Sequence, residues 1–533
     1  MRGADLLVRT LAIAGVDRIF SLSGNQIMPV YDACIDAGIE IIHTRHEAAA
    51  VFMADAYAQL TGGIGVCLVT AAPGATNALG PLYTARQSES PVLFLTGDSP
   101  LSQDGQGAFQ ELDQVPMTTP LTKLSVRANS AIELGNEIAV AVQTTLSGRP
   151  GPVHVALPSD VLEGDARGAE LPDAQDLRPR PDPMNASEVT VLLKALAAAK
   201  APLILCGPSM NNTRAGSTLT KLADALDAPV LAMESPRGLN DPALGDFAKA
   251  FEHADLIVSL GKPIDFSLGF GASTDSNWIV IDPENARIDQ AKLNLGEKLN
   301  FAVVADPHSA ALALIEKGPG INARNDWRAK VGALITRRNL SATDTKQSGK
   351  ITSSDLCIAV QKQIAQASLS VVISDGGEFG QWSQACTSPT YRIINGPSGA
   401  IGGALCFGIA TKKAKPDATV FALMGDGTVG FHFAEFETAA RENSAFVVVI
   451  GNDLRWNAEH QIQLRDYGPD RLIGCQLSGA RYDKAAEALG AHGEYVTDLT
   501  DLDAALARAV QSGKVACVNV EIEGLPAPGE RAH

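Results

Sequence analysis

The chain has 533 residues, enough for three to four domains of about 150 residues each. Hydrophobic residues make up 45% and charged residues 19%, a globular composition that excludes a disordered or fibrous chain. The 43 Lys and Arg against 60 Asp and Glu give a net charge of −17, which argues against a general binder of nucleic acid or anionic membranes. A local cationic site for a small anion stays compatible with this balance.

The cysteines and the N-terminal residues indicate the compartment. Charged residues at Arg2, Asp5 and Arg9 stand where a signal peptide requires an apolar run. No apolar stretch approaches the roughly 20 residues of a membrane-spanning helix. The cysteines form no CxxC pair, which favours free thiols over a disulfide framework or a zinc site. They are residues 34, 67, 206, 357, 386, 406, 475 and 517. We therefore expect a soluble cytoplasmic protein with neither nucleic-acid nor membrane partners.

Short, uninterrupted apolar runs recur along the chain and are typical of buried strands. Because neither face of such a run is polar, they favour parallel strands covered on both sides. Helices alternate with them: one is expected over 44–61, and one begins at the capping residues 353–355 with apolar residues at four-residue spacing. This alternation predicts doubly wound parallel α/β architecture, with ligands at the carboxyl ends of the strands. The runs are 66–70, 92–95, 153–157, 203–206, 256–260, 371–374, 420–424 and 446–450.

Two irregular segments divide the chain into three pieces. Residues 171–183 contain too many prolines for a helix or an inner strand, and residues 341–350 are polar without any apolar period. We therefore predict an N-terminal domain over 1–172, a central domain over 184–335 and a C-terminal domain over 350–533. Each falls within the usual range of domain sizes.

A strand, a glycine-rich turn, a helix and a second strand follow one another between Met424 and Asp453. Asp426 follows the first of these strands, and Asn452 and Asp453 end the second. Oxygen ligands at the ends of neighbouring parallel strands can converge on Mg²⁺ or Ca²⁺, and Mg²⁺ often completes its shell with phosphate oxygens. The glycines and the helix start favour a phosphate group nearby. Alone, the Gly-Asp-Gly triplet is more typical of a tight turn; the second oxygen-rich turn favours the metal.

The N-terminal region carries a second group of polar residues. Glu47 lies in the first turn of the expected helix, where the helix dipole by itself favours a carboxylate. The next strand runs into a turn and helix start over 71–77 that could bind a polar ligand. A further strand is followed by the loop 106–111.

Taken in order, these segments resemble the thiamine diphosphate enzymes of the acetolactate synthase, 2-oxo acid decarboxylase and 2-hydroxyacyl-CoA lyase superfamily. The resemblance extends over almost the whole chain. Its motifs are 24–33 (GNQIMPVYDA), 45–47 (RHE), 73–77 (PGATN), 107–111 (GAFQE), 148–153 (GRPGPV), 399–402 (GAIG) and 424–453. It implies pyrimidine-binding, central Rossmann-like and diphosphate-binding domains. It also implies an active site between the first domain of one subunit and the last domain of another, and hence a homodimer or homotetramer.

The resemblance assigns roles to individual residues. Glu47 would hydrogen-bond the aminopyrimidine ring and favour the imino tautomer that deprotonates the thiazolium carbon. Ile401 would support the bent cofactor. Asp426 and the 452–453 turn would hold Mg²⁺ or Ca²⁺. The remaining implied cofactor contacts are Pro73, Asn77, Glu378, Gly425, Gly427 and Thr428.

The second metal-binding turn departs from the family pattern, which usually reads Asn-Asn. Ungapped counting places Asp453 at the ligand position, whereas a shift of one residue makes Asn452 the ligand. The backbone carbonyl that usually serves as a third ligand falls at Arg455 in place of the frequent glycine.

Substrate specificity depends on fewer residues. Asn25 faces the thiazolium in relatives and can orient a substrate or water but cannot act as an acid or base. Gln110 matches active-site loop residues of acetolactate synthases and hydroxyacyl-CoA lyases alike. Glu459 falls where 2-oxo acid decarboxylases carry an active-site Glu, and a raised pKa there would suit proton transfer; a solvated helix face is the alternative. Glu378 lies in a segment that lines the diphosphate and substrate region.

The expected activity is Mg²⁺-dependent C–C lyase or carboligase chemistry on a small 2-oxo acid, of acetolactate synthase type. A 2-hydroxyacyl-CoA or oxalyl-CoA lyase or decarboxylase is the alternative within the superfamily. A non-catalytic thiamine diphosphate-fold subunit and a flavin-linked oxidase are remote alternatives. The central domain of acetolactate synthases often binds FAD, so FAD is possible here; residues 184–330 carry no clear flavin-contacting signature, and FAD is not predicted.

Overall fold

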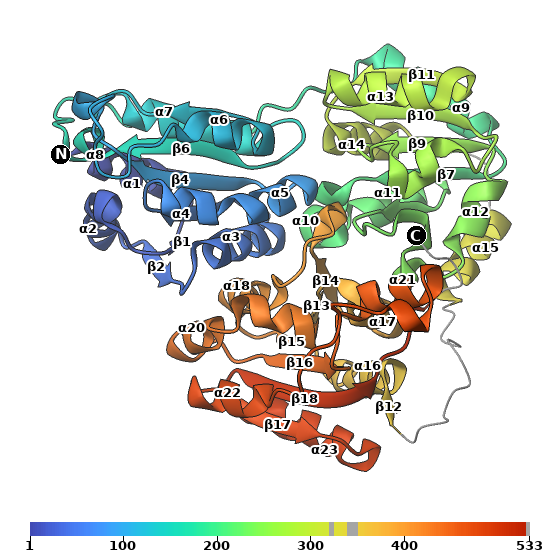
Figure 1. Ribbon diagram of the computed structural model, residues 1–533. Coiled ribbons are helices and arrows are strands. Elements are labelled where there is room, and N and C mark those ends of the chain that lie inside the picture. Colours follow the sequence, from blue (N-terminus) through green and yellow to red (C-terminus); the bar gives the residue numbers. More distant parts are fainter. Residues whose placement is uncertain (319–324, 338–349, 529–533) are drawn as a thin grey trace. The chain divides into compact units, whose positions relative to one another are not determined.

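The computed structural model describes residues 1–318, 325–337 and 350–528 (Figure 1). The chain forms two compact units, Met1–Arg180 with Ile409–Ala414, and Pro181–Gly408 with Lys415–His533. The first predicted linker lies in an irregular stretch between α8 (Ser159–Glu163) and α9 (Ala186–Ala198). The second, 341–350, lies outside the described residues apart from Lys350.

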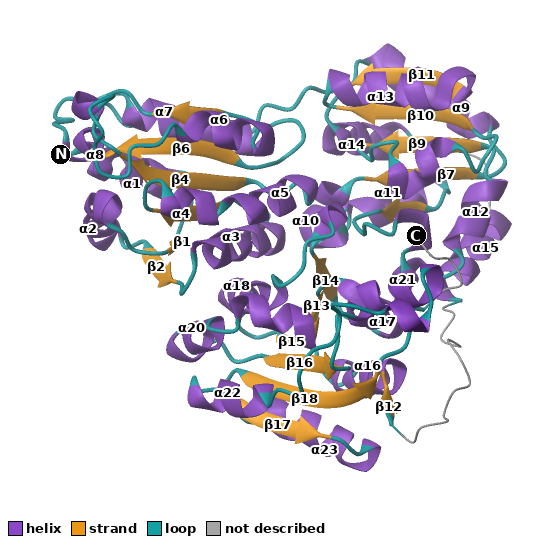
Figure 2. Cartoon of the chain, viewed as in Figure 1, coloured by secondary structure: helices purple, strands orange, loops and turns teal. Residues whose placement is uncertain are grey.

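The first unit is built on a six-stranded parallel sheet with the order β2-β1-β3-β4-β6-β5. Its strands are β1 (Arg18–Ser21), β2 (Glu40–His43), β3 (Gly65–Val69), β4 (Val92–Asp98), β5 (Ser125–Arg127) and β6 (Val153–Pro158). Its further helices are α1 (Gly3–Ile13), η1 (Asn25–Ile27), α2 (Met28–Ala37), α3 (Glu47–Thr61), α4 (Pro73–Asn77), α5 (Leu79–Gln87), α6 (Gln114–Thr118) and α7 (Leu134–Leu146). Helices cover both faces of the sheet (Figure 2).

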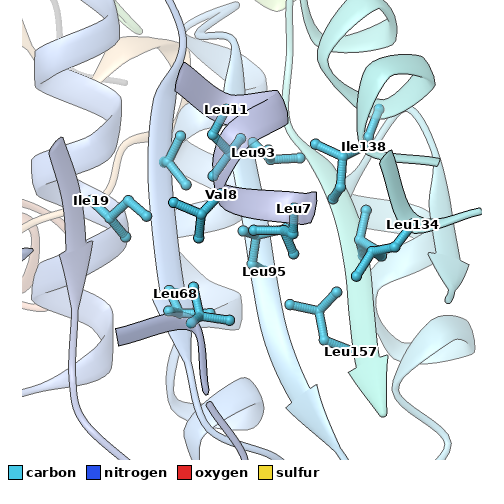
Figure 3. Close-up of a cluster of buried hydrophobic side chains, with 14 of the residues drawn as sticks. Leu7, Val8, Leu11, Ile19, Leu68, Leu93, Leu95, Leu134, Ile138 and Leu157 are labelled. Atoms are coloured by element: carbon cyan, nitrogen blue, oxygen red, sulfur yellow. The ribbon is translucent and has the colours of Figure 1, made fainter. Parts of the chain in front are cut away.

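The core of this unit shows why the apolar runs became inner strands. Figure 3 shows Leu7 and Leu11 of α1 and Leu134 of α7 directed toward the sheet, where Leu93 and Leu95 of β4 meet them. All of these side chains are fully buried. The alternate residues of the same strands are also buried beneath helices of the opposite face, as expected for a parallel sheet.

The second unit contains two parallel sheets. The five-stranded sheet has the order β11-β10-β9-β7-β8. Its strands are β7 (Pro202–Cys206), β8 (Val230–Ala232), β9 (Leu256–Leu260), β10 (Asn277–Asp282) and β11 (Leu299–Val304). Its helices are α9, α10 (Asn212–Ala215), α11 (Thr218–Leu226), α12 (Phe247–His253), α13 (Asn285–Leu295), α14 (Pro307–Lys317) and α15 (Asn325–Thr336).

The other sheet has the order β12-β18-β16-β15-β13-β14, with β17 paired to β18. Its strands are β12 (Ile351–Thr352), β13 (Ser370–Ser374), β14 (Tyr391–Ile394), β15 (Thr419–Gly425), β16 (Val447–Asn452), β17 (His492–Val496) and β18 (Ala516–Glu523). The helices of this part are α16 (Ser353–Ile364), α17 (Gly377–Cys386), α19 (Asp426–Val429), α20 (Glu435–Arg441), α21 (Asn457–Asp466), α22 (Tyr482–Ala488) and α23 (Leu499–Gln511). Helix α18 (Ala404–Ala414) is divided between the units, because its residues from Ile409 onward belong to the first. Side chains of α16, α17 and α23 share one core with the strands.

All eight apolar runs predicted as strands are strands, which confirms the three-sheet α/β prediction; only their ends differ, by up to three residues. The helix expected from residue 44 begins at Glu47, because β2 continues to His43 and His46 takes the N-cap position. The N-cap of α16 is Thr352, whose side chain accepts from the Asp355 N–H in a reciprocal capping box.

The strand orders define where ligands are expected to bind. In the first sheet the chain reverses its direction of travel between β1 and β3, and in the third it does so between β13 and β15. Ligands of doubly wound folds bind beyond the carboxyl ends of the strands at such points. In the described residues no helix is long and apolar enough to cross a membrane.

Candidate active site

Glu47 lies at the carboxyl end of β2, where it begins α3. Its carboxylate is half-buried, and Oε2 accepts a hydrogen bond of 3.0 Å from Nδ2 of Asn77. A Cβ on Gly74 would lie 3.7 Å from Glu47 Oε1. The structure therefore brings together Glu47 and the Pro73–Asn77 turn, as the sequence predicts. Burial, assisted by the negative charge of Glu47, raises the pKa of the Cys67 thiol.

The turn from β3 into α4 holds strained backbone beside Glu47. Ala72 has a φ of 46° immediately before Pro73, a conformation that non-glycine residues rarely adopt. Strain of this kind gathers at ligand sites, because only a fixed surrounding structure maintains it. The surrounding structure therefore holds the Pro73–Asn77 turn in one position.

Gln110 lies in a loop that a neighbouring carboxylate organises. Glu111 accepts hydrogen bonds from the N–H groups of Gly105, Gly107 and Ala108 at 2.6, 2.9 and 3.0 Å. Gln110 itself has a φ of 60°, and Phe109 before it is exposed. The Gln110 side chain reaches back to the β1 loop, where Nε2 of Gln26 donates to its Oε1 at 2.8 Å. Asn25, next to Gln26, has an exposed side chain.

Asp426 and Asp453 meet at the carboxyl ends of β15 and β16 in the second unit. Their side chains are buried, and burial raises the pKa of both carboxyls; for Asp453 the neighbouring charge of Asp426 adds to the rise. Oδ2 of Asp426 is buried without a hydrogen-bond partner in the described part of the chain. Two buried carboxylates with an unsatisfied oxygen between strand ends suit a hard cation. Among the described residues, no group of three or more His, Cys, Asp or Glu that could hold a metal occurs, so other ligands would complete the shell.

Asn452 is engaged away from this pair. Its Nδ2 donates to Oδ1 of Asn519 on β18 at 3.1 Å, and its Oδ1 accepts from the Leu454 N–H at 3.3 Å. The backbone carbonyl of Arg455 is the expected third ligand. The Arg455 guanidinium donates to the Asp453 carbonyl at 3.0 Å and also contacts His460. Leu454 between them has a φ of 61°.

The glycine-rich turn after β15 is closely packed. A Cβ on Gly427 would lie 2.6 Å from the Trp456 ring, so only glycine allows the indole to cover this turn. The Thr428 hydroxyl donates to the Gly425 carbonyl at 3.2 Å. Gly425 is the N-cap of α19, so Gly425, Gly427 and Thr428 form one turn beside Asp426.

Ile401 is held by a carboxylate to which the sequence assigned no role. Asp375, buried at the end of β13, accepts from the N–H groups of Gly376 and Gly402 and from Nδ2 of Asn395, at 2.7, 2.9 and 2.8 Å. The Asn395 amide also donates to the Ala400 carbonyl at 2.6 Å. Burial raises the pKa of Asp375 to about 6, although these donors oppose the rise. A Cβ on Gly376 would lie 2.5 Å from Ile401, so the two loops are in direct contact.

Glu378, in the first turn of α17, is near two charged side chains. Burial raises the pKa of Glu378; the positive charge of Arg237 opposes the rise, and the negative charge of Glu459 adds to it. Burial also lowers the pKa of Arg237. Glu459 is exposed in the first turn of α21. The sequence did not single out Arg237, because a lone Arg after a short strand carries no recognisable motif.

Comparison with known proteins identifies the family. The N-terminal TPP-binding domain model of thiamine pyrophosphate enzymes matches residues 1–117, the central domain model 189–314 and the C-terminal TPP-binding domain model 375–520. A probable acetolactate synthase of Mycobacterium bovis is 30% identical over 98% of this chain and 95% of its own length. The chain belongs to the thiamine pyrophosphate enzyme family.

Two further relatives represent both activities expected within this family. The 2-hydroxyacyl-CoA lyase 2 of Homo sapiens is 29% identical over 92% of this chain and 84% of its own length. A probable acetolactate synthase large subunit of Methanocaldococcus jannaschii is 27% identical over 100% of this chain and 94% of its own. The protein is therefore a thiamine pyrophosphate (thiamine diphosphate) enzyme with relatives of both kinds. The N-terminal model includes Glu47 and Gln110, and the C-terminal model includes Asp375, Asp426 and Asp453.

Proposed function

We propose that this enzyme is a Mg²⁺-dependent C–C lyase or carboligase that acts on a small 2-oxo acid, as acetolactate synthases do. The observation that carries the proposal is the buried Asp426–Asp453 pair with its unsatisfied Oδ2. A buried carboxylate pair without a cation is costly, since each charge loses hydration and the two repel. A divalent ion shared with a diphosphate removes both costs.

The metal would be held by Asp426, Asp453 and the backbone carbonyl of Arg455. Ca²⁺ could take the same oxygen ligands. Asn452 is the weaker candidate, because its amide already serves Asn519 and Leu454. Gly425, Gly427 and Thr428 would lie along the diphosphate, where backbone N–H groups and the start of a helix favour phosphate oxygens. Glu378 is proposed to face the same region.

Glu47 and Ile401 would hold the remainder of the cofactor. Bound thiamine diphosphate supplies a thiazolium carbon that, once deprotonated, adds to a carbonyl and takes up the electron pair released by C–C cleavage. Glu47 would hydrogen-bond the aminopyrimidine ring, and Asn77 fixes the direction of its carboxylate. Pro73 shapes the same turn. Ile401, braced by the Asp375 loop, would support the cofactor from below.

Substrate handling would fall to Asn25, Gln110 and Glu459. The two amides can orient a carbonyl or carboxylate, and the exposed Glu459 carboxyl could move a proton to or from the substrate. Active sites are proposed to lie between subunits of a homodimer or homotetramer, with Glu47 from one chain and Asp426 from another. The domains 1–172, 184–335 and 350–533 and a cytoplasmic location are part of the same proposal.

The alternative is a 2-hydroxyacyl-CoA or oxalyl-CoA lyase. It is supported by the human 2-hydroxyacyl-CoA lyase 2, which is nearly as similar to this chain as the mycobacterial relative.

A substrate panel separates these activities. Purified protein with thiamine diphosphate and Mg²⁺ is given pyruvate, longer 2-oxo acids, oxalyl-CoA or 2-hydroxyacyl-CoAs, each with and without an aldehyde acceptor. Cofactor-dependent release of CO₂ from a 2-oxo acid, with carboligation, supports the proposal. Turnover of acyl-CoA substrates alone would replace it with the lyase. A preparation that binds the cofactor but converts no substrate would indicate a non-catalytic subunit.

A further inference from the structure

Three polar side chains of the first unit form a directed chain of hydrogen bonds at the point where the first sheet reverses direction. The Thr70 hydroxyl, directly after β3, donates to Oε1 of Gln26 at 2.6 Å. Nε2 of Gln26 then donates to Oε1 of Gln110 at 2.8 Å. Gln26 lies in η1 after β1 and is buried, with a relative exposure of 6% for the residue. The chain thus runs from a strand end, through a buried amide, to a loop residue of the candidate active site.

The backbone around Gln26 holds it in this position. A Cβ on Gly24 would lie 2.2 Å from Cβ of Thr70, so glycine is required for the β1 loop to approach β3 so closely. On the other side, a Cβ on Gly97 would lie 2.9 Å from Cβ of Gln26. Gln26 is therefore confined between the ends of β3 and β4, where its amide bonds to Thr70 and Gln110.

This arrangement fixes which end of the Gln110 amide stays available. A carboxamide has an oxygen that accepts and a nitrogen that donates two hydrogen bonds. Because Thr70 occupies the Gln26 oxygen, Gln26 offers its nitrogen to Gln110, and the Gln110 oxygen becomes occupied in turn. What Gln110 retains for a ligand is its Nε2–H donors. The backbone of Gln110 has a φ of 60° in the loop whose preceding Gly107 N–H is held by the Glu111 carboxylate, and this loop keeps the side chain at that place.

We propose that Gln26 is a positioning residue that orients the Gln110 amide so that its nitrogen donates to an oxygen of the substrate, the carbonyl or carboxylate of a 2-oxo acid. This role rests on the proposed function. It extends that function by giving the site a preference for a substrate with a hydrogen-bond acceptor beside Gln110. The exposed side chain of Asn25 does not impose this preference.

The substitution Gln26→Met tests the link by removing both polar ends at similar volume. We expect kcat/KM for the fastest 2-oxo acid of the panel, pyruvate included, to fall at least tenfold, mainly through KM, with the Kd for thiamine diphosphate unchanged. Gln110→Met should cause a similar loss, and the double variant should be no worse than the poorer single variant, because residues acting as one unit are not additive. Gln114→Met is the matched control: Gln114 is also buried and donates to the Gly97 carbonyl at 2.9 Å, but in the described part of the chain it does not hydrogen-bond Gln110. The fold-loss in kcat/KM caused by Gln114→Met should multiply with the fold-loss caused by Gln110→Met in the corresponding double variant.

The substitution Gln26→Glu gives a pH profile of kcat/KM that distinguishes the two roles. If Gln26 had only a structural role, this profile would not change. While protonated, the new carboxyl can donate to Oε1 of Gln110 and kcat/KM should stay near wild type. Once ionised it only accepts, so the Gln110 amide must reverse and present its oxygen to the substrate oxygen. We expect kcat/KM to fall as pH rises through the pKa of that carboxyl, which burial raises from about 4.

The outcomes are distinguishable. Additive losses for Gln26→Met and Gln110→Met, or a pH profile of Gln26→Glu parallel to wild type, would overturn the role of Gln26 while leaving the proposed function intact. A wild-type enzyme without cofactor-dependent turnover of any 2-oxo acid would overturn the proposed function, and the substrate role of Gln26 with it.

Discussion

The carboxyl groups of Asp426 and Asp453 lie against each other at the ends of the adjacent strands β15 and β16. The pairing register places Gly425 opposite Gly451. Asp426 therefore lies one residue beyond this pair on β15, and Asp453 lies two residues beyond it on β16, so the two side chains leave the sheet at nearly the same height. Burial raises the pKa of both groups, and at Asp453 the positive charge of Arg455 only opposes the rise. Such a contact is unfavourable in the absence of a cation, which makes it a sensitive place to test the proposed metal site.

Asp453→Ala is expected to act in opposite directions on the apo and metal-bound protein. Removing one charge relieves the repulsion, so the apo protein should melt at a higher temperature near pH 7. The same change should raise the Mg²⁺ concentration for half-saturation of cofactor binding by roughly 10- to 100-fold. Both are measured, by thermal melting and by fluorescence quenching with thiamine diphosphate. Asn452→Ala is the control: it should lower the melting temperature through the lost Asn519 contact but leave the Mg²⁺ requirement near wild type. If the Asn452 variant instead raised the Mg²⁺ requirement more than the Asp453 variant, the metal ligand would be Asn452.

Glu47→Gln is expected to leave thiamine diphosphate bound while slowing hydrogen–deuterium exchange at the thiazolium carbon by orders of magnitude. An amide still fills the space beside Asn77 but cannot hold the negative charge that favours the imino tautomer. Exchange is followed by NMR of acid-quenched cofactor and requires no substrate. Asn77→Ala, which removes only the 3.0 Å bond to Glu47, should give a smaller effect. An exchange rate unaltered by Glu47→Gln would remove Glu47 from the site.

Arg392→Met is expected to destabilise the second unit strongly. The Arg392 guanidinium on β14 pairs with Glu234 at 3.0 Å and with Asp241 at 3.2 Å, and both acids are buried. Removing the cation leaves two buried charges, a loss of about 3–5 kcal/mol in the free energy of unfolding. Lys362→Met is the matched control, because Lys362 and its partner Asp503 are more than half exposed and the pair should contribute less than about 1 kcal/mol. Equal melting temperatures for the two variants would contradict the assignment.

Asp375 predicts a pH dependence of stability. Burial raises its pKa to about 6 in the folded protein, against about 4 in the unfolded chain. The folded state therefore binds this proton more tightly, and the contribution of Asp375 to stability, present below about pH 4, is lost as pH rises through about 6, by roughly 3 kcal/mol. The difference in unfolding free energy between wild type and Asp375→Asn isolates this group. That difference should shrink from pH 4.5 to 7.5; a constant difference would contradict the shift.

The sequence predicted the strands and the strand ends that carry the candidate site residues. It could do so because an uninterrupted apolar run has few alternatives to a buried parallel strand. The predicted topology also placed Asp426 with Asp453, since the carboxyl ends of neighbouring strands meet, whereas only the family resemblance placed Glu47 and Asn77 at one site. For the strands and the aspartate pair, local pattern and topology determine which residues come together.

What the sequence could not predict depends on contacts between distant segments. Asp375 follows a predicted strand, yet nothing local indicates that its partners are Asn395 and Gly402. Gln26 was part of a recognised motif, but its link to Gln110 joins residues 84 positions apart. The proposed preference for Asp453 over Asn452 as a metal ligand likewise depends on the position of Asn519, which accepts from the Asn452 amide.

The central claim is that Glu47 of one subunit and Asp426 of another complete a single active site. Mixing Glu47→Gln with Asp426→Ala subunits, each inactive alone, and reassociating them tests it directly. If sites form between subunits of a two-fold dimer, random pairing restores both residues at about a quarter of all sites. Thiazolium hydrogen–deuterium exchange should then return to about a quarter of the wild-type rate. If no exchange is recovered although hybrid dimers form, both residues serve a site within one chain, and the account is wrong.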